Sequence, residues 1–422
     1  MDNRIPAVLN QQRRPYMNSM VLKELVKIFA SKCGVEIRRK RSASSSFRFI
    51  SLNSNNQSKG DVLLSYLLDP FLASENDSLF DNHTQYWECL QMARTFTDLG
   101  YTVDVINSLS PPDEKFVGAK KYSFYVDTYK NIDTIAPLLD KECIRIYHIT
   151  RAHWLFNNAA ESKRCLELQQ RKAVTIKPRR QVQPYFGIEL ANYGITVGNE
   201  FTISTYAYAN KPIYRIPITT SAEYPWPESK DYGACRRNFL WLGGRGAVHK
   251  GLDLVLDVFR GMPDYNLIVC GDIRKEDDFE TAYFRELYET RNIKTLGWID
   301  VRSGDFSRVI GSCVGIINPS CAEGCSGSVI QGMHAGLIPV VSRESGVDVD
   351  DFGIVLKESS ISEIKSSVVE ISSLHETELK SMSRKAWEFA RANHTRERFA
   401  EEYRKVIAAI ISQQQGGQKL IR

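Results

Sequence analysis

Residues 314–343, with the sequence VGIINPSCAEGCSGSVIQGMHAGLIPVVSR, constrain the fold of this chain more than any other stretch. The apolar run 314–317 predicts a buried parallel strand, which ends before Pro319 because proline cannot donate to the ladder of a central strand. A Gly- and Ser-rich turn then leads into a helix with one apolar side. Gly336 closes that helix, and the run 338–342 predicts the next strand. The stretch therefore predicts one strand–helix–strand unit of a parallel sheet.

The start of this predicted helix is suited to binding a phosphate. Its first backbone N–H groups have no partner inside the helix, and the helix dipole favours a negative group there. Small residues let a diphosphate approach the backbone: Gly324, Cys325, Ser326, Gly327 and Ser328. Glu323 lies just outside the helix, where it can accept hydrogen bonds from hydroxyls, and Gln331 follows one turn beyond the small residues on the same side. The pattern indicates a pocket for a nucleotide-sugar, and the alternative is the Gly-rich turn of any doubly wound sheet.

The order Pro-Ser, Glu, Gly-rich turn, helix and Gly-x-x-Pro-Val-Val in this stretch resembles the donor-site signature of the retaining glycosyltransferases of family 4, which have the GT-B fold. That family usually carries two glutamates separated by seven residues. Glu323 matches the first glutamate, and Gln331 stands at the second position. The resemblance implies that Glu323 holds hydroxyls of the transferred sugar. It also implies that Gln331 holds the nucleotide ribose, since an amide both donates and accepts hydrogen bonds.

A second resemblance to the same family lies in the loop GGRGAVHKG at 243–251, which follows the apolar run 238–242. The family has an arginine and a lysine in this loop, and Arg245 and Lys250 match them. The resemblance implies that both cations, with Gly244 beside them, grip the diphosphate. Two cations stabilise the charge that develops as the sugar–phosphate bond breaks, so we expect no metal and no other cofactor. An ordinary surface arginine and lysine are the alternative.

Residues 61–219 alternate apolar strand patterns with helical ones, which predicts one parallel sheet with helices on both faces. Ligands gather beyond the carboxyl ends of such strands, and Asp127 and His148 lie at two such ends. The family resemblance implies that His148 contacts the donor sugar or shuttles a proton, and a histidine satisfied in the core is the alternative. His83, next to a helix start, is a further candidate that faces the acceptor, although the family's Gly-Gly loop is missing there.

The predicted fold class is therefore α/β: a GT-B fold of two doubly wound, Rossmann-like domains that face each other across a cleft, with a basic N-terminal arm. The predicted division is a basic amphipathic arm at 1–60, an acceptor-side domain at 61–219, a linker at 220–235, a nucleotide-sugar domain at 236–395, a final helix that crosses back to the first domain at 396–412, and a disordered tail at 413–422.

Positive charge is concentrated in the predicted arm. Residues 1–60 hold twelve Lys and Arg against three acidic residues, whereas the whole 422-residue chain has a net charge of only +5. Residues 20–41 combine an apolar helical stripe with basic residues, which fits contact with an anionic membrane surface. A solvated arm, or a helix docked on the body, is the alternative. The arm has no recognisable nucleic-acid-binding fold, so we expect no nucleic-acid partner.

Nine scattered cysteines without a Cys-x-x-Cys pair, no secretory signal and no apolar run long enough for a membrane span favour the cytoplasm, with peripheral contact at the inner face of the membrane. The expected activity is that of a retaining hexosyltransferase. It would move a sugar from a nucleoside-diphosphate sugar to a hydroxyl of a glycan or lipid-linked acceptor, in glycan, polysaccharide or glycolipid synthesis. Two alternatives remain: a sugar-nucleotide epimerase or hydrolase on the same fold, and a non-catalytic nucleotide-sugar-binding subunit.

Overall fold

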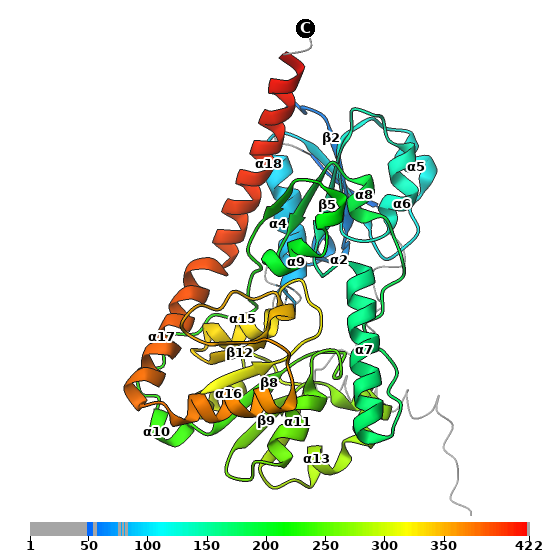
Figure 1. The fold of residues 1–422 in the computed structure, drawn as a ribbon. Helices are drawn as coiled ribbons and strands as arrows, with labels where there is room; N and C mark the ends of the chain where they lie inside the picture. The colour runs from blue at the N-terminus through cyan, green and yellow to red at the C-terminus, as the bar shows by residue number, and fades with distance from the viewer. Residues whose placement is uncertain (1–48, 54–56, 75–76, 78–79, 81–82, 420–422) are drawn as a thin grey trace, which may run out of the picture. The chain divides into compact units, whose positions relative to one another are not determined.

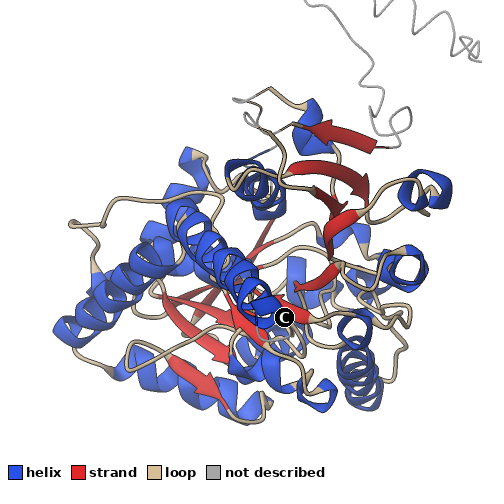
Figure 2. Cartoon of the chain, turned by 90° about the horizontal axis from the view of Figure 1, so that it is seen from above, coloured by secondary structure: helices blue, strands red, loops and turns tan. Residues whose placement is uncertain are grey.

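The computed structural model of the chain describes residues 49–53, 57–74, 77, 80 and 83–419. These residues form two β-sheets with parallel strands in the majority, and helices flank the strands (Figures 1 and 2). Most of the predicted basic arm, including the candidate membrane segment 20–41, lies outside the described residues. No described helix is both long and apolar enough to cross a membrane.

The first sheet has seven strands in the order β1-β3-β2-β4-β5-β6-β7. The strands are β1 (Phe49–Leu52), β2 (Asp61–Tyr66), β3 (Thr102–Asn107), β4 (Tyr122–Asp127), β5 (Ile144–Ile149), β6 (Tyr193–Thr196) and β7 (Ile213–Arg215). Neighbouring strands are parallel except β1, which runs antiparallel to β3. The helices of this half are α2 (Asp69–Leu72), α4 (Thr84–Asp98), α5 (Glu114–Gly118), α6 (Asn131–Ile135), α7 (Trp154–Lys172), α8 (Gly187–Leu190) and α9 (Glu200–Ser204).

The second sheet has six parallel strands in the order β10-β9-β8-β11-β12-β13. The strands are β8 (Asn238–Leu242), β9 (Asn266–Cys270), β10 (Ile293–Gly297), β11 (Gly315–Asn318), β12 (Ile338–Ser342) and β13 (Ile354–Leu356). The helices of this half are α10 (Tyr232–Cys235), α11 (Leu252–Arg260), α12 (Asp277–Ala282), α13 (Phe284–Tyr288), α14 (Gly304–Ser312), α15 (Gly327–His334), α16 (Ile361–Ser373) and α17 (Glu376–Asn393). The strand order reverses between β8 and β11, and open α/β sheets bind ligands at such a point.

Two long helices pack on both halves of the described chain (Figure 1). Helix α7 follows β5, but its Leu168 belongs to the same hydrophobic cluster as Phe259 of α11 in the second half. Helix α18 (Arg396–Lys419) follows α17, and its Tyr403 shares a cluster with Phe96 of α4 in the first half. The apolar side chains of these helices therefore tie the two sheets to one hydrophobic framework.

The folded body begins earlier than the predicted residue 61, because β1 pairs with the edge strand β3. Phe49 of β1 stacks on Phe116, with ring centroids 3.9 Å apart. Ser51 of the same strand donates to the buried carboxylate of Asp104 in β3. A strand of four residues next to a Ser-rich basic stretch has too short a pattern to be separated from an arm by periodicity alone.

The C-terminal tail predicted to be disordered from 413 is instead helical, because α18 continues through Lys419. Gln413 donates from Nε2 to the hydroxyl of Tyr214 at 3.1 Å, and Gln414 donates to the hydroxyl of Tyr193 at 3.2 Å. Glutamine also has a favourable helix propensity. These contacts with the edge of the first sheet explain why the helix extends beyond its apolar stripe.

Candidate functional site

The loops after β8 and β11 bring two of the predicted residues together at the point where the strand order reverses. Lys250 donates from Nζ to Oε1 of Glu323, whose carboxylate is almost fully buried. Ser320 Oγ donates to the same oxygen at 3.3 Å, and the backbone N–H of Glu323 donates to the carbonyl of Glu344 at 2.9 Å. Glu323 is therefore fixed by its own backbone and by a charge-assisted hydrogen bond.

A second cation approaches the same carboxylate from a segment that carries no recognised motif. Arg180, in the connection between α7 and α8, places Nη2 3.8 Å from Oε2 of Glu323. The run Lys177-Pro178-Arg179-Arg180 is visible in the sequence as a basic connector, but nothing in that pattern links it to Glu323, which is far along the chain. Only the path of α7 toward the second sheet brings Arg180 to the site.

The two cations determine the protonation state of Glu323. Burial alone raises the pKa of this carboxyl, but the positive charges of Lys250 and Arg180 more than offset burial, and the pKa falls to about 2. Glu323 is therefore a carboxylate throughout the physiological pH range. As a carboxylate it accepts hydrogen bonds and cannot donate a proton as a general acid.

The start of α15 has the small residues and free N–H groups that the sequence predicts. Ser326 precedes the helix without a side-chain capping bond, and its own N–H donates to the carbonyl of Ser345 at 2.9 Å. Within the described part of the chain, the N–H groups of Gly327 and Ser328 have no protein acceptor, and both residues are partly exposed. This helix start is therefore open to an anionic ligand.

Gly324, next to Glu323, is packed against the first half of the chain. Its carbonyl accepts a hydrogen bond of 2.7 Å from Oγ1 of Thr202. A Cβ atom on Gly324 would lie 2.4 Å from the carbonyl oxygen of Thr150, so only glycine fits between these loops. Cys325 is half-buried, and burial raises the pKa of its thiol. Because the thiol stays protonated, we interpret Cys325 as a structural residue of the turn. Among the described residues, no group of three His, Cys, Asp or Glu is placed to hold a metal ion.

Arg245 and Gly244 make no ion pair or hydrogen bond with Glu323 within the described chain. Both residues are exposed, and in the described chain Arg245 has no carboxylate within ion-pair distance. The buried carboxylate of Glu276 accepts from the N–H groups that follow, at Gly246 and, at 3.2 Å, Ala247, and so holds the backbone of this loop. The contact of Arg245 and Gly244 with a diphosphate stays a prediction.

The structure gives Gln331 a different task from the predicted contact with a ribose. Its Oε1 accepts from Oγ1 of Thr220 at 3.0 Å and from the N–H of Ala222 at 3.2 Å. Its Nε2 donates to the carbonyl of Ala222 at 2.7 Å and to the hydroxyl of Tyr224 at 3.0 Å. All four hydrogen-bonding positions of the amide are used by the segment that joins the two sheets. A ribose would reach Gln331 only at the expense of these bonds.

His148 and Asp127 are buried inside the first sheet. The ring of His148 lies between Tyr66 and Tyr403, with centroids 6.1 and 6.5 Å away, and neither ring nitrogen has a partner among the described residues. Burial lowers the pKa of His148 to about 4. Asp127 accepts from the N–H of Ile132, in the first turn of α6, at 2.7 Å, and burial raises its pKa to about 6. Both side chains are fully buried, which favours the alternative of a core histidine for His148, and their contact with a substrate stays a prediction.

His83, in contrast, lies near the cations of the site. It caps the start of α4, where its Nδ1 accepts from the N–H of Gln85 at 3.3 Å. Partial burial of the ring, together with the positive charges of Arg180 and Lys250, lowers the pKa of His83. The residue as a whole is nevertheless exposed. It is therefore a neutral group from the first half of the chain that borders the site around Glu323.

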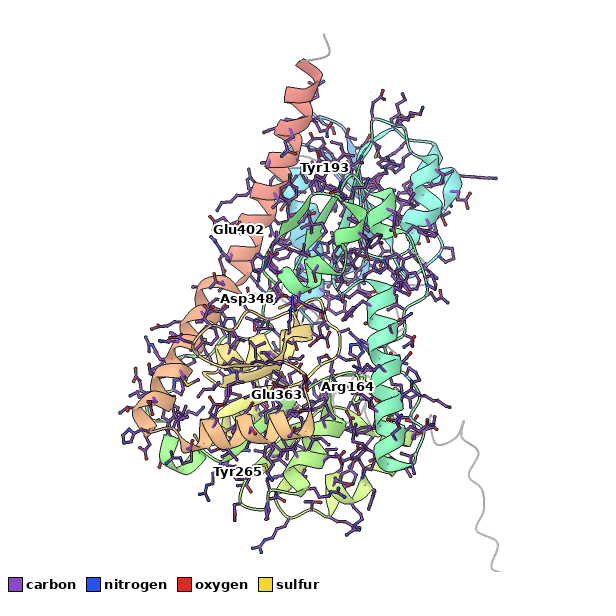
Figure 3. All side chains as sticks on the ribbon, in the orientation of Figure 1. Arg164, Tyr193, Tyr265, Asp348, Glu363 and Glu402 are labelled. Carbon is purple, nitrogen blue, oxygen red and sulfur yellow. The ribbon has the colours of Figure 1, made fainter. Side chains whose placement is uncertain are left out.

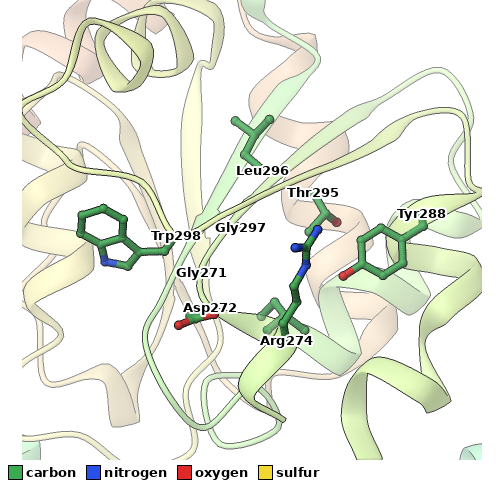
Figure 4. A pocket seen from close by; sticks show the side chains of 9 residues that line it. Gly271, Asp272, Arg274, Tyr288, Thr295, Leu296, Gly297 and Trp298 are labelled. Atoms are coloured by element: carbon green, nitrogen blue, oxygen red, sulfur yellow. The ribbon is translucent and has the colours of Figure 1, made fainter. Parts of the chain in front are cut away.

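A cavity of about 240 Å³ opens beyond the carboxyl ends of β9 and β10 (Figure 4). It is lined by Gly271, Asp272, Ile273, Arg274, Tyr288, Thr295, Leu296, Gly297 and Trp298. Trp298 is 69% exposed, which leaves one large aromatic ring open to a ligand. A Cβ atom on Gly271 would lie 2.5 Å from the carbonyl oxygen of Gly243, so the cavity adjoins the Gly-rich loop 243–251. We refer to this cavity, for the ligand group that it is proposed to hold, as the base cavity. The sequence did not predict it, because its residues come from separate turns.

No protein-family model matches the sequence, and no curated protein matches it. Solved structures do match. The chain aligns over 85% of its length with 100% of sucrose-phosphate synthase from Thermosynechococcus elongatus, at 15% identity and a TM-score of 0.57. It aligns over 84% of its length with 99% of HepE from Anabaena in complex with UDP-glucose, at 13% identity and a TM-score of 0.53. The chain spans 54% of the length of TarM from S. aureus, with a TM-score of 0.48. The first two likenesses and the two doubly wound sheets confirm the predicted GT-B fold.

Proposed function

We propose that this protein is a glycosyltransferase that moves a hexose from a nucleoside-diphosphate sugar to an acceptor hydroxyl, with retention at the anomeric carbon. The observation that carries the proposal is the buried pair of Glu323 and Lys250. It lies where the strand order of the second sheet reverses, beside the open start of α15. HepE, which shares the fold, was solved with UDP-glucose, and this supports a uridine diphosphate sugar as the donor.

Each residue of the site has a task in this reaction. The diphosphate lies at the start of α15, where the N–H groups of Gly327 and Ser328 and the ammonium of Lys250 stabilise the charge on the leaving phosphate. Glu323 accepts hydrogen bonds from sugar hydroxyls and so orients the anomeric carbon. The nucleobase lies in the base cavity against Trp298. Because protein cations and helix N–H groups already face the diphosphate, we expect no metal and no other cofactor.

Retention, membership of family 4 and a glycan or lipid-linked acceptor are proposed from the resemblance of the loops that carry Lys250 and Glu323. The same holds for a role in polysaccharide or glycolipid synthesis. A cytoplasmic location, with contact between residues 20–41 and the inner face of the membrane, stays a prediction.

The test uses the full chain and begins with thermal unfolding in the presence of UDP, ADP, GDP or dTDP, since a ligand at a hundred times its Kd adds about 2.7 kcal/mol of stability. The sugar nucleotide of the best base is then incubated with and without an alkyl glycoside acceptor. NMR of the product reports its anomeric configuration. The substitution Glu323→Gln preserves size and removes charge, and we expect kcat to fall by about 100-fold or more. Affinity for UDP should be retained or increased, because Lys250 is released to the phosphate.

Glu370→Gln is the matched control, because it makes the same chemical change on the exposed surface of α16 and should leave activity unchanged. Full transfer activity in Glu323→Gln would contradict the proposal. Donor consumed at the same rate without acceptor would favour the epimerase or hydrolase instead. Donor binding without any turnover would favour the non-catalytic subunit.

A further inference from the structure

The family resemblance implies two cations at the diphosphate, and in the described chain Arg245 is exposed and forms no ion pair, whereas Arg180 contacts Glu323. We infer that Arg180, from the connection between α7 and α8, is this second donor-binding cation. The inference rests on the proposed function and names a residue that neither resemblance to family 4 nor the motifs of the second half assign. Its guanidinium and the ammonium of Lys250 contact opposite oxygens of Glu323.

The position of Arg180 over the Gly-rich loop is the first argument. A Cβ atom on Gly246 would lie 2.7 Å from Cγ of Arg180, so the arginine stem lies directly on this loop. Gly246 also has a φ of 97°, which favours glycine, and the close contact with Arg180 excludes a side chain there in any case. Arg180 thus covers the loop that carries Arg245.

The backbone around Arg180 is held firmly while its guanidinium stays accessible. Oε1 of Glu161, on α7, accepts from the N–H groups of Arg179 and Arg180 at 2.8 and 2.9 Å. Nδ2 of Asn157 donates to the carbonyl of Arg180 at 2.9 Å. The Arg180 side chain is nevertheless 40% exposed. A fixed backbone and a partly exposed guanidinium that already faces Glu323 fit a residue that meets a ligand, because less entropy is lost when the ligand binds.

Helix α7 anchors this segment to the half of the chain that holds the donor. Arg171, near its C-terminus, donates to the buried carboxylate of Asp253 in α11 at 2.6 Å. Arg164, labelled in Figure 3, donates from Nη1 to the carbonyl of Pro319 at 3.1 Å. Lys177 donates from its backbone to Asp278 at 2.9 Å. Arg180 therefore belongs to the first half by sequence but to the second half by its contacts.

The charges around Glu323 also favour an anionic ligand. Two cations, Lys250 and Arg180, face the single carboxylate of Glu323, while the carboxylate of Glu161 is occupied by the backbone N–H groups of Arg179 and Arg180. A diphosphate placed there meets Lys250 on one side and the planar guanidinium of Arg180 on the other. Arginine offers several N–H donors in a fixed plane, so it can hold a phosphate through two parallel bonds while it still faces Glu323.

The experiment compares the binding of UDP and of uridine to the full chain by calorimetry. In Arg180→Ala we expect UDP to bind about tenfold more weakly or worse, and uridine to bind with unchanged affinity, because uridine has no phosphate for the guanidinium to contact. Arg180→Lys should recover part of the loss, since it keeps the charge without the fork. Arg308→Ala is the matched control: it removes an exposed arginine that pairs with Asp305 within α14.

The outcomes separate the two proposals. If wild-type protein binds UDP and Arg180→Ala binds it equally well, this inference is overturned while the proposed function stands. The same holds if Arg245→Ala weakens UDP binding and Arg180→Ala does not. Equal weakening of UDP and uridine in Arg180→Ala would mark a structural role and would also overturn the inference. If the wild-type chain binds no nucleoside diphosphate, the proposed function and this inference both fall.

Discussion

The substitution Gln331→Glu distinguishes the structure from the family resemblance most sharply. The resemblance places a glutamate here to hold the ribose, so on that basis the change should improve donor binding. In the structure Nε2 of Gln331 donates two hydrogen bonds, to the carbonyl of Ala222 and to the hydroxyl of Tyr224. A carboxylate donates none. We therefore expect Gln331→Glu to destabilise the fold.

The size of the loss follows from the partners that remain. Thr220 Oγ1 and the N–H of Ala222 still donate to the introduced carboxylate, so two of the four bonds survive. The two lost bonds cost about 1 kcal/mol each, and the partly buried Ala222 carbonyl, within 3.1 Å of Thr220 Oγ1, is left 2.7 Å from an oxygen in place of a donor. Because Gln331 is buried, its replacement also buries a negative charge, which costs about 1–3 kcal/mol more, and we expect the free energy of unfolding to fall by about 3–5 kcal/mol at pH 8. This is a large part of the typical stability of about 5–15 kcal/mol.

Urea unfolding followed by fluorescence measures the loss, and its pH dependence identifies the cause. Burial raises the pKa of the introduced carboxyl, so the cost is present above that pKa and disappears below it, where the protonated group donates to the Ala222 carbonyl. The deficit should therefore shrink between pH 8 and pH 5. Gln170→Glu, on the exposed side of α7, is the matched control and should change little. A Gln331→Glu protein as stable as wild type at pH 8 that binds UDP more tightly would refute this reasoning.

Two further predictions concern other parts of the molecule. Trp298→Ala should weaken the binding of UDP and of uridine to the same extent, by about 5-fold to 150-fold in calorimetry, because stacking of a base on an aromatic ring contributes about 1–3 kcal/mol; unchanged uridine affinity would place the base elsewhere. His148→Leu should not reduce stability at pH 7, since neither ring nitrogen has a hydrogen-bond partner in the described part of the chain. The pKa of this buried imidazole is about 4 in the folded protein and about 6.5 in the unfolded chain. Between pH 6.5 and 4 the proton therefore binds only to the unfolded chain, and this lowers the free energy of unfolding of the wild type by up to about 3 kcal/mol. The acid decline of stability should therefore be shallower in His148→Leu, and an equally steep decline would contradict the burial argument.

Local sequence patterns were sufficient to predict the bounds of a strand where one short stretch forms the whole strand. Strands β8 and β12 have the predicted bounds, 238–242 and 338–342, because uninterrupted apolar runs end at Gly or polar residues there. The loops that follow β8 and β11 were predicted for the same reason. Lys250 and Glu323 lie in these loops, and their meeting follows from the rule that the carboxyl ends of parallel strands share one edge of a sheet.

Contacts between distant segments could not be predicted in this way. The pattern of β5 shows that His148 alternates with its neighbours, but it does not show that Tyr403 of α18 covers it. The helical spacing of α15 gives the side on which Gln331 lies, yet its partners come from residues 220–224, whose conformation has no periodicity. Arg180 and Arg245 look equally suitable as phosphate ligands in the sequence. Only tertiary structure separates them, because Glu276 fixes one loop and α7 carries the other arginine inward.

Segments that lie between the two sheets carry polar contacts around Glu323. Arg180, in the connection between α7 and α8, contacts Glu323 itself. In the chain that joins the two sheets, Glu88 of α4 accepts from the N–H and Oγ1 of Thr219 at 2.9 and 2.8 Å, and Gln331 binds the residue that follows. On the inference for Arg180, a donor that binds only when Arg180 faces Glu323 must stabilise the contacts that hold Arg180 by the same free energy with which those contacts strengthen donor binding. We therefore expect donor affinity to depend also on ion pairs such as Arg171–Asp253, which do not touch Glu323.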